Sequence, residues 1–109
     1  VPLDAPFSEV VSSITEGRKG AVAVVGADGI LAGIITDGDV RRAFTRDIAA
    51  VVAADIMSPN PKVVGPGARM SDVVDLIVQN KISNLFVTVE GRPVAIVHIA
   101  ELMQAGYVS

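Results

Sequence analysis

Apolar residues in the first half of the chain recur at the spacing of a helix and then in two short runs typical of strands. The helical spacing predicts a helix over residues 7–17, which ends at a glycine. The two runs predict strands over residues 21–25 and 30–35, joined by a hairpin turn at Asp28-Gly29. A second helix is expected to begin at Thr36. The apolar positions that these helices turn inward are Val10, Val11 and Ile14 in the first and Val40, Ala43 and Phe44 in the second.

The second half of the chain repeats this pattern. The segment 8–11, followed by Ile14, reappears 63 residues later as 71–74, followed by Ile77. A short sheet with a helix on either side cannot bury both of its faces alone. We therefore expect an α/β module of the α+β kind, in which two β-α-β-β-α units related by a pseudo-twofold axis pack together. The elements predicted for the second unit are an extended piece at 62–64, a helix at 70–80, strands at 85–89 and 93–97, and a helix at 99–105.

The boundary between the two repeats lies near residues 47–60. Residues 48–57 have a helical pattern, and the two prolines at 59 and 61 must end this helix because each disfavours a helical residue before it. We therefore divide the chain into a first repeat, residues 1–47, a linker helix with a proline-rich turn, residues 48–61, and a second repeat, residues 62–109.

Composition excludes several classes of function. The chain has no cysteine and one histidine, which excludes a disulfide scaffold, a thiol nucleophile and a metal site built on these residues. No apolar run is long enough to span a membrane, no signal peptide is visible, and we expect a cytoplasmic protein. The net charge of −3 argues against a nucleic-acid partner. Because no nucleophile, acid–base pair or glycine-rich dinucleotide motif is found, we expect no catalytic residues, no metal and no required cofactor.

The most conspicuous polar segment lies where the second predicted strand passes into a helix. The first turn of a helix favours an anion, and Gly38 allows a ligand to approach the backbone. Thr36 offers a hydroxyl, and Asp39 offers a carboxylate that suits a ribose diol. Arg41 and Arg42 add positive charge one turn later. The same residues also fit a helix cap, with Thr36 at the N-cap, Asp39 at the third helical position and the arginines on a solvated face.

The matched junction in the second repeat is His98-Ile99-Ala100-Glu101. It has neither glycine nor arginine, so it is the weaker anion site, and His98 is more typical of a helix cap or a buried structural residue. The loops before the first strand of each repeat, Arg18-Lys19-Gly20 and 80–84, either line a pocket or are simply solvated.

Two repeats of a helix, two strands and a helix resemble a tandem pair of CBS domains. In that family the second strand ends in a glycine, two apolar residues, Thr or Ser, and an Asp three positions later. Residues 33–39 match this motif in full, and the resemblance implies that Thr36 contacts a nucleotide phosphate and Asp39 the ribose. The second repeat departs from the motif, because Ala95 and His98 replace the glycine and the Thr or Ser.

Three segments further resemble the C-terminal CBS pair of arabinose 5-phosphate isomerases, which make a precursor of the Kdo sugar of lipopolysaccharide. They are residues 36–42, 55–62 and 98–108. The resemblance implies a regulatory fragment of such an isomerase that is not itself catalytic. The ligand that the resemblance implies is a small anionic nucleotide or nucleotide sugar such as CMP-Kdo, with AMP or ATP as the generic alternative. The other hypotheses are an oligomerisation module without a ligand and the CBS pair of a sugar-nucleotide transferase that binds AMP or ATP.

These arguments define one set of candidate residues and one expected assembly. The candidate ligand-binding residues are Gly20, Ala21, Thr36, Asp37, Gly38, Asp39, Arg41, Arg42, His98 and Glu101. We also expect a homodimer through the two apolar helix faces, and a tetramer of the full-length protein. The faces consist of Val10, Val11 and Ile14 in the first repeat and of Val73, Val74 and Ile77 in the second.

Overall fold

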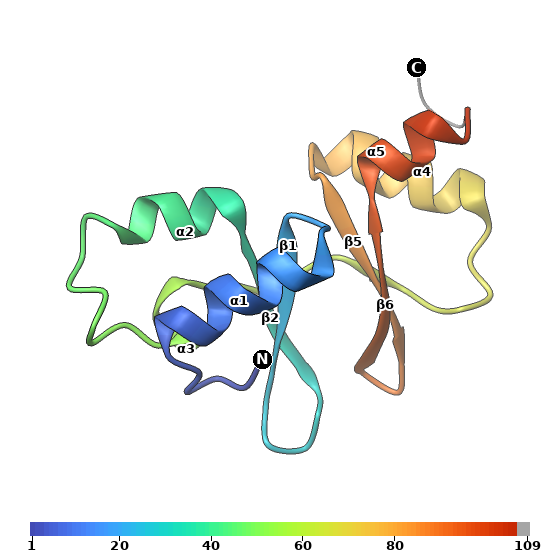
Figure 1. The fold of residues 1–109 in the computed structure, drawn as a ribbon. Coiled ribbons are helices and arrows are strands. Elements are labelled where there is room, and N and C mark those ends of the chain that lie inside the picture. The colour runs from blue at the N-terminus through green and yellow to red at the C-terminus, as the bar shows by residue number, and fades with distance from the viewer. Residues whose placement is uncertain (107–109) are drawn as a thin grey trace. The chain divides into compact units, whose positions relative to one another are not determined.

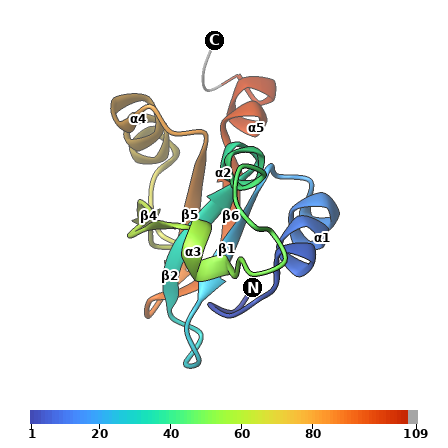
Figure 2. The same cartoon turned by 90° about the vertical axis from the view of Figure 1, so that its left-hand side faces the viewer.

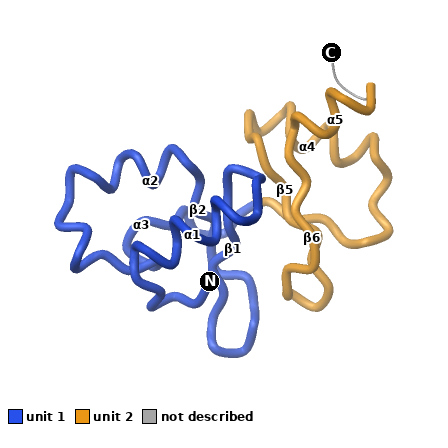
Figure 3. Tube along the Cα trace, in the orientation of Figure 1, with its two compact units in different colours: residues 1–61 blue, residues 62–109 orange. Residues whose placement is uncertain are grey.

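The chain forms two compact units, each built on a small sheet. The computed structural model describes residues 1–106, so Tyr107 and Val108 of the C-terminal motif lie outside the described residues. One unit comprises residues 1–61 and the other residues 62–109 (Figure 3). Each has one three-stranded sheet with its own helices, which confirms the predicted α+β class and its repeat (Figure 1).

In the first unit an antiparallel sheet lies against a long helix. The sheet has the order β1-β2-β3, and Ala21 of β1 pairs with Thr36 of β2. Helix α1 lies beside this sheet (Figure 2). The core between them contains Val10 and Ile14 of α1 and Val24 and Ile35 of the strands. The elements are α1 (Phe7–Gly17), β1 (Ala21–Val25), β2 (Leu31–Thr36), α2 (Asp37–Ala43), α3 (Ala53–Ile56) and β3 (Ser58–Pro59).

The second unit repeats this arrangement with a parallel first strand. Its sheet has the order β4-β5-β6, in which β4 pairs parallel to β5 and β5 pairs antiparallel to β6. The core is formed by Val73 and Ile77 of the helix with Leu85 and Leu102. The elements are β4 (Val63–Val64), α4 (Met70–Asn80), β5 (Asn84–Val89), β6 (Arg92–His98) and α5 (Ile99–Gln104).

The two long helices also end in the same way. Helix α1 ends at Gly17 as predicted, and the left-handed residue that caps it is Arg18, with φ of 57°. Helix α4 ends at Asn80 and is likewise capped by a left-handed residue, Lys81, with φ of 53°. A left-handed residue at a helix end is usually glycine, because other side chains are strained there. A basic residue, arginine in one helix and lysine in the other, therefore caps both helices, 63 residues apart.

The first repeat is one residue longer than the second, and the extra residue lies in its hairpin. In the first, the N–H of Gly29 donates to the carbonyl of Gly26 and Gly29 has φ of 82°, which makes a turn followed by a left-handed glycine. In the second, Glu90 and Gly91 both have positive φ, which is the two-residue turn that matches strand twist.

The linker differs from the prediction. The expected helix over residues 48–57 is wrong, because only α3 is helical and residues 48–50 form a turn. The two β-branched valines before α3 favour extended backbone. Val52 pairs with Pro6, and the N–H of Ala53 donates to the carbonyl of Ala5. The proline-rich segment then adds β3 to the sheet of the first unit, so the linker completes that unit.

Burial changes the interpretation of the apolar helix faces. Val10 and Ile77 are fully buried, and Ile14 and Val73 are 6% and 5% exposed within the chain itself. The faces that we assigned to a dimer are therefore the cores of the two units. Phe44 was expected to turn inward, but it is 63% exposed at the end of α2. Its ring packs edge-to-face with that of Phe7, and the two ring centroids lie 5.5 Å apart.

Gly33 provides a test of how β2 and β3 pack. A Cβ on Gly33 would lie 2.5 Å from the sulfur of Met57 and 2.9 Å from the carbonyl oxygen of Ser58. We expect Gly33→Ala to lower the free energy of unfolding by about 1–3 kcal/mol, because this space is already filled. Gly17→Ala is the control, since nothing lies within 4 Å of its added Cβ. Equal thermal midpoints for the two variants would contradict this packing.

Candidate functional site

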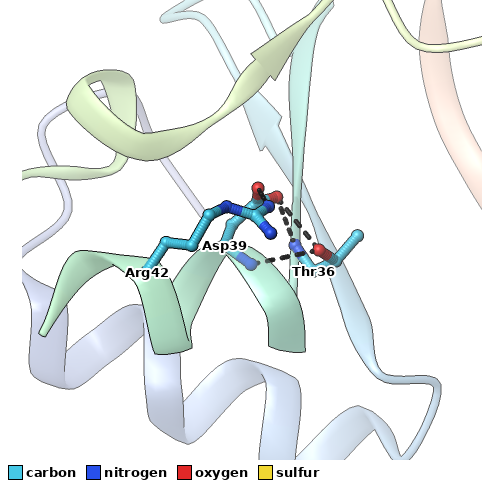
Figure 4. Close-up of polar contacts among 3 residues, drawn as sticks. All are labelled: Thr36, Asp39 and Arg42. Carbon is cyan, nitrogen blue, oxygen red and sulfur yellow. Dashed lines mark hydrogen bonds and ion pairs between the residues drawn. The ribbon is translucent and has the colours of Figure 1, made fainter.

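The predicted polar junction lies where β2 ends and α2 begins. Thr36 has extended backbone, with φ of −107°, and serves as the N-cap of α2. The N–H of Asp39 donates to the hydroxyl oxygen of Thr36 at 3.3 Å. The N–H of Thr36 donates to Oδ2 of Asp39 at 2.9 Å (Figure 4). The capping interpretation is thus confirmed, and the ligand interpretation stays a prediction.

The carboxylate of Asp39 is the centre of this junction. Its Oδ2 also accepts the Thr36 hydroxyl at 3.1 Å, and its Oδ1 accepts a bond from Arg42 (Figure 4). Asp39 is 9% exposed, whereas the side chain of Arg42 is 73% exposed. The carboxylate is therefore buried with three donors, and a ligand hydroxyl meets a site that is already partly occupied.

The loop before β1 lies against the same junction. The N–H of Asp37 donates to the carbonyl of Gly20 at 3.0 Å, and Ala21 pairs with Thr36 across the sheet. A Cβ on Gly20 would lie 3.1 Å from Oδ2 of Asp37, and Gly20 has φ of 68°. Eight of the ten candidate residues are thus gathered in the first unit, because α2 is continuous with this strand end.

Few hydrogen-bond donors remain for an anion at this junction. The N–H groups of Asp37 and Asp39 are already used, while that of Gly38 has no acceptor within residues 1–106. A Cβ on Gly38 would lie 3.3 Å from Nη1 of Arg42, so glycine allows the guanidinium to lie over the backbone. Arg41 is exposed and its side chain has no partner among the same residues. Arg41 is therefore the cation that is most available to a ligand.

The two remaining candidates lie in the second unit. Nδ1 of His98 accepts the N–H of Ala100 at 3.0 Å, and the N–H of His98 donates to Oε1 of Glu101 at 3.0 Å. His98 therefore caps α5, as expected. The N–H of Ile99 donates to the carbonyl of Ser83 at 2.8 Å, which reproduces the contact between Asp37 and Gly20.

A hollow that was not predicted from the sequence lies beside the junction. It has a volume of about 200 Å³ and lies between the end of α2 and α3. Arg46 donates from Nη1 to the carbonyl of Asp55 at 3.0 Å, which links the two sides. No sequence signal pointed to it, because it depends on α3 folding back onto α2. The lining residues are Asp39, Arg42, Ala43, Arg46, Asp55 and Ile56.

Two further features are absent from the described part of the chain. No helix within residues 1–106 is both long and apolar enough to cross a membrane. Across the same residues, no group of three or more His, Asp or Glu side chains is arranged to hold a metal ion.

Comparison with known proteins identifies the repeat. A family model for the CBS domain matches the chain twice, over residues 1–46 and 52–107. The chain belongs to the CBS domain family. Among solved structures, the CBS domain NE2398 superposes with a TM-score of 0.85 at 21% identity, covering 99% of this chain and 87% of that one. CBSX2 in complex with AMP superposes with a TM-score of 0.78 at 20% identity, covering 96% and 84%.

Curated relatives of this CBS pair include arabinose 5-phosphate isomerases. The chain is 37% identical over 90 residues to the isomerase KpsF of Escherichia coli, covering 81% of this chain and 28% of that protein. It is 31% identical over 109 residues to the isomerase KdsD of Pseudomonas aeruginosa, covering 97% and 33%. The chain thus spans about a third of the length of these relatives.

Asp39 provides a test of the junction. Asp39→Ala leaves the N–H and hydroxyl of Thr36 without their acceptor, and we expect it to lower the free energy of unfolding by about 1–3 kcal/mol. Asp39→Asn retains one acceptor oxygen and is expected to cost less. Chemical denaturation measures both. A midpoint for Asp39→Ala equal to that of the parent would show that the cap does not hold the junction.

Proposed function

We propose that this CBS pair is a ligand-sensing regulatory module that binds a small anionic nucleotide at the Thr36–Arg42 junction. The proposal places it in a cytoplasmic isomerase of the arabinose 5-phosphate type, where it is regulatory and not catalytic. The observation that carries the proposal is the full family motif at a strand end that also presents an exposed, unpartnered Arg41 among residues 1–106. The AMP complex of CBSX2, a protein of the same fold, supports a nucleotide as the ligand class.

The hydrogen bonds at the junction assign different roles to its residues. The hydroxyl of Thr36 already donates to Asp39, so Thr36 positions the carboxylate and does not donate to a phosphate. The phosphate is instead bound by the N–H of Gly38 and by Arg41, whose guanidinium forms paired bonds with phosphate oxygens. Arg42 is exposed enough to turn from Asp39 toward an anion. Oδ1 of Asp39 then accepts a ribose hydroxyl.

Two ligands are compatible with these roles. AMP or ATP supplies the phosphate and the ribose diol, and CMP-Kdo adds a sugar carboxylate. The relationship to the KpsF and KdsD isomerases supports CMP-Kdo, since it is the activated sugar of the pathway that the family resemblance implies. A sugar-nucleotide transferase would instead use AMP or ATP. The second junction, at His98 and Glu101, is proposed as the weaker site because it has no arginine.

The competing proposal is an oligomerisation module without a ligand. The confirmed cap at Thr36 and Asp39 supports it, because both residues then have a sufficient structural role. The two proposals differ in one property. A ligand that binds only the folded chain raises its thermal midpoint, whereas a purely structural module does not respond to nucleotides.

Arg41 gives the sharper test of nucleotide binding. A charge-assisted hydrogen bond contributes about 1.5–3 kcal/mol, so we expect Arg41→Ala to weaken the binding of AMP and CMP-Kdo by roughly 10–150-fold. Arg42→Ala is a less direct test, because it removes the ion-pair partner of Asp39 as well as a proposed ligand contact. Arg92→Ala, which removes an exposed arginine of β6, is the matched control.

Calorimetry on these variants decides between the proposals. Unchanged dissociation constants for Arg41→Ala would remove Arg41 from the site. A parent chain that binds neither nucleotide would leave the oligomerisation module as the function.

The proposed homodimer needs a surface other than the one first assigned to it. The faces with Val10 and Val73 are buried, whereas Val78 of α4 and Met103 of α5 are 55% and 50% exposed. We expect light scattering at tens of micromolar to give twice the mass of 11.3 kDa. Val78→Asp should then shift the mass to that of the monomer. A parent chain that is monomeric at this concentration contradicts the dimer.

A further inference from the structure

The hollow beside the junction is lined by arginines and carboxylates, some of whose donors and acceptors make no hydrogen bond within residues 1–106. Arg46 directs one N–H of its guanidinium to the carbonyl of Asp55, and its other donors have no acceptor within residues 1–106. Oδ2 of Asp55 accepts the N–H of Val52 at 3.0 Å, and Oδ1 has no donor among the same residues. Arg42 and Asp39 form the wall shared with the junction.

This lining matches a particular chemistry. Two guanidinium groups bind one carboxylate or phosphate, and two carboxylates accept hydroxyl groups. The apolar side chains of Ala43 and Ile56 complete the surface that a sugar carbon face contacts. The volume of about 200 Å³ is below the roughly 300–1,000 Å³ of pockets that hold a whole drug-sized ligand. The hollow therefore has room for one sugar and its anionic group.

We propose that the hollow is a subsite for an anionic sugar, with Arg46 and Arg42 on the anionic group and Asp55 on a hydroxyl. The sugar reaches it from two sources. It is either free in solution or joined to the nucleotide bound at the junction, and only the second source rests on the proposed function. Arg46 is then the residue that distinguishes a nucleotide sugar from the bare nucleotide.

The segment that supplies Asp55 lies outside the family motif at residues 33–39. Asp55 reaches the hollow because Asp55 accepts the Val52 N–H and so fixes the start of α3. The backbone of Arg46 is held by its N–H bond to the carbonyl of Ala43, which continues α2 for one more turn. Both sides of the hollow are therefore anchored within the first unit, before any ligand binds.

Calorimetry on the parent, Arg46→Ala, Arg46→Lys and the control Arg92→Ala tests the subsite with two pairs of probes. Ribose 5-phosphate and ribose form the free pair, and CMP-Kdo and CMP form the joined pair. We expect the parent to bind ribose 5-phosphate more tightly than ribose, or CMP-Kdo more tightly than CMP, or both. Arg46→Ala should reduce that preference by roughly 10-fold or more, and Arg46→Lys should restore part of it, while Arg92→Ala leaves it unchanged.

The outcomes separate the subsite from the nucleotide site. A preference for CMP-Kdo over CMP that Arg46→Ala removes assigns the joined source, and the same result with ribose 5-phosphate assigns the free source. If CMP and AMP bind but neither pair shows a preference, the subsite is wrong and the nucleotide site stands. If no nucleotide binds but ribose 5-phosphate binding depends on Arg46, the nucleotide site is wrong and the subsite stands. Equal preference in the parent and Arg46→Ala overturns the subsite.

Discussion

The buried carboxylate of Asp39 links the end of strand β2 to helix α2 at the candidate site. It accepts the N–H and the hydroxyl of Thr36 at the end of β2 and the guanidinium of Arg42 on α2. A buried charge is costly unless it is paired and hydrogen-bonded, and the two bonds from Thr36 with the one from Arg42 meet this requirement. Their formation fixes the direction in which α2 leaves the sheet. The arginines that follow are positioned as a consequence.

This arrangement separates the residues that form the cap from those that remain available to a ligand. Thr36 is committed to the cap, whereas Arg41 and most donors of Arg46 face solvent. Exposed arginines bind planar anions without disturbing the core, because their guanidinium groups are weakly hydrated and preorganised. The proposed phosphate contacts therefore come from Gly38 and Arg41, which do not form the bonds of the cap.

Periodicity and local motifs predicted most of the fold. The helix at 7–17, the two hairpins and the cap at Thr36 depend on neighbours in sequence, and all are confirmed. The linker could not be predicted in this way, because residues 51–59 take their structure from the backbone of Ala5 and the edge of β2. The same cause hid the hollow, since Asp55 meets Arg46 only after α3 folds back. The burial of Val10 and Ile77 could not be predicted either, because it depends on packing within each unit. Since both side chains are buried there, they do not form the surface first assigned to a dimer.

The proposed nucleotide site lies where β2 passes into α2. The most direct test is a crystal structure of the chain soaked with AMP and, separately, with CMP-Kdo. We expect ligand density against Gly38 and Arg41, with a ribose hydroxyl on Oδ1 of Asp39 and Arg42 turned toward the anion. Density elsewhere on the chain, or a soaked crystal in which Arg42 still pairs with Asp39 and no nucleotide is bound, would contradict the claim.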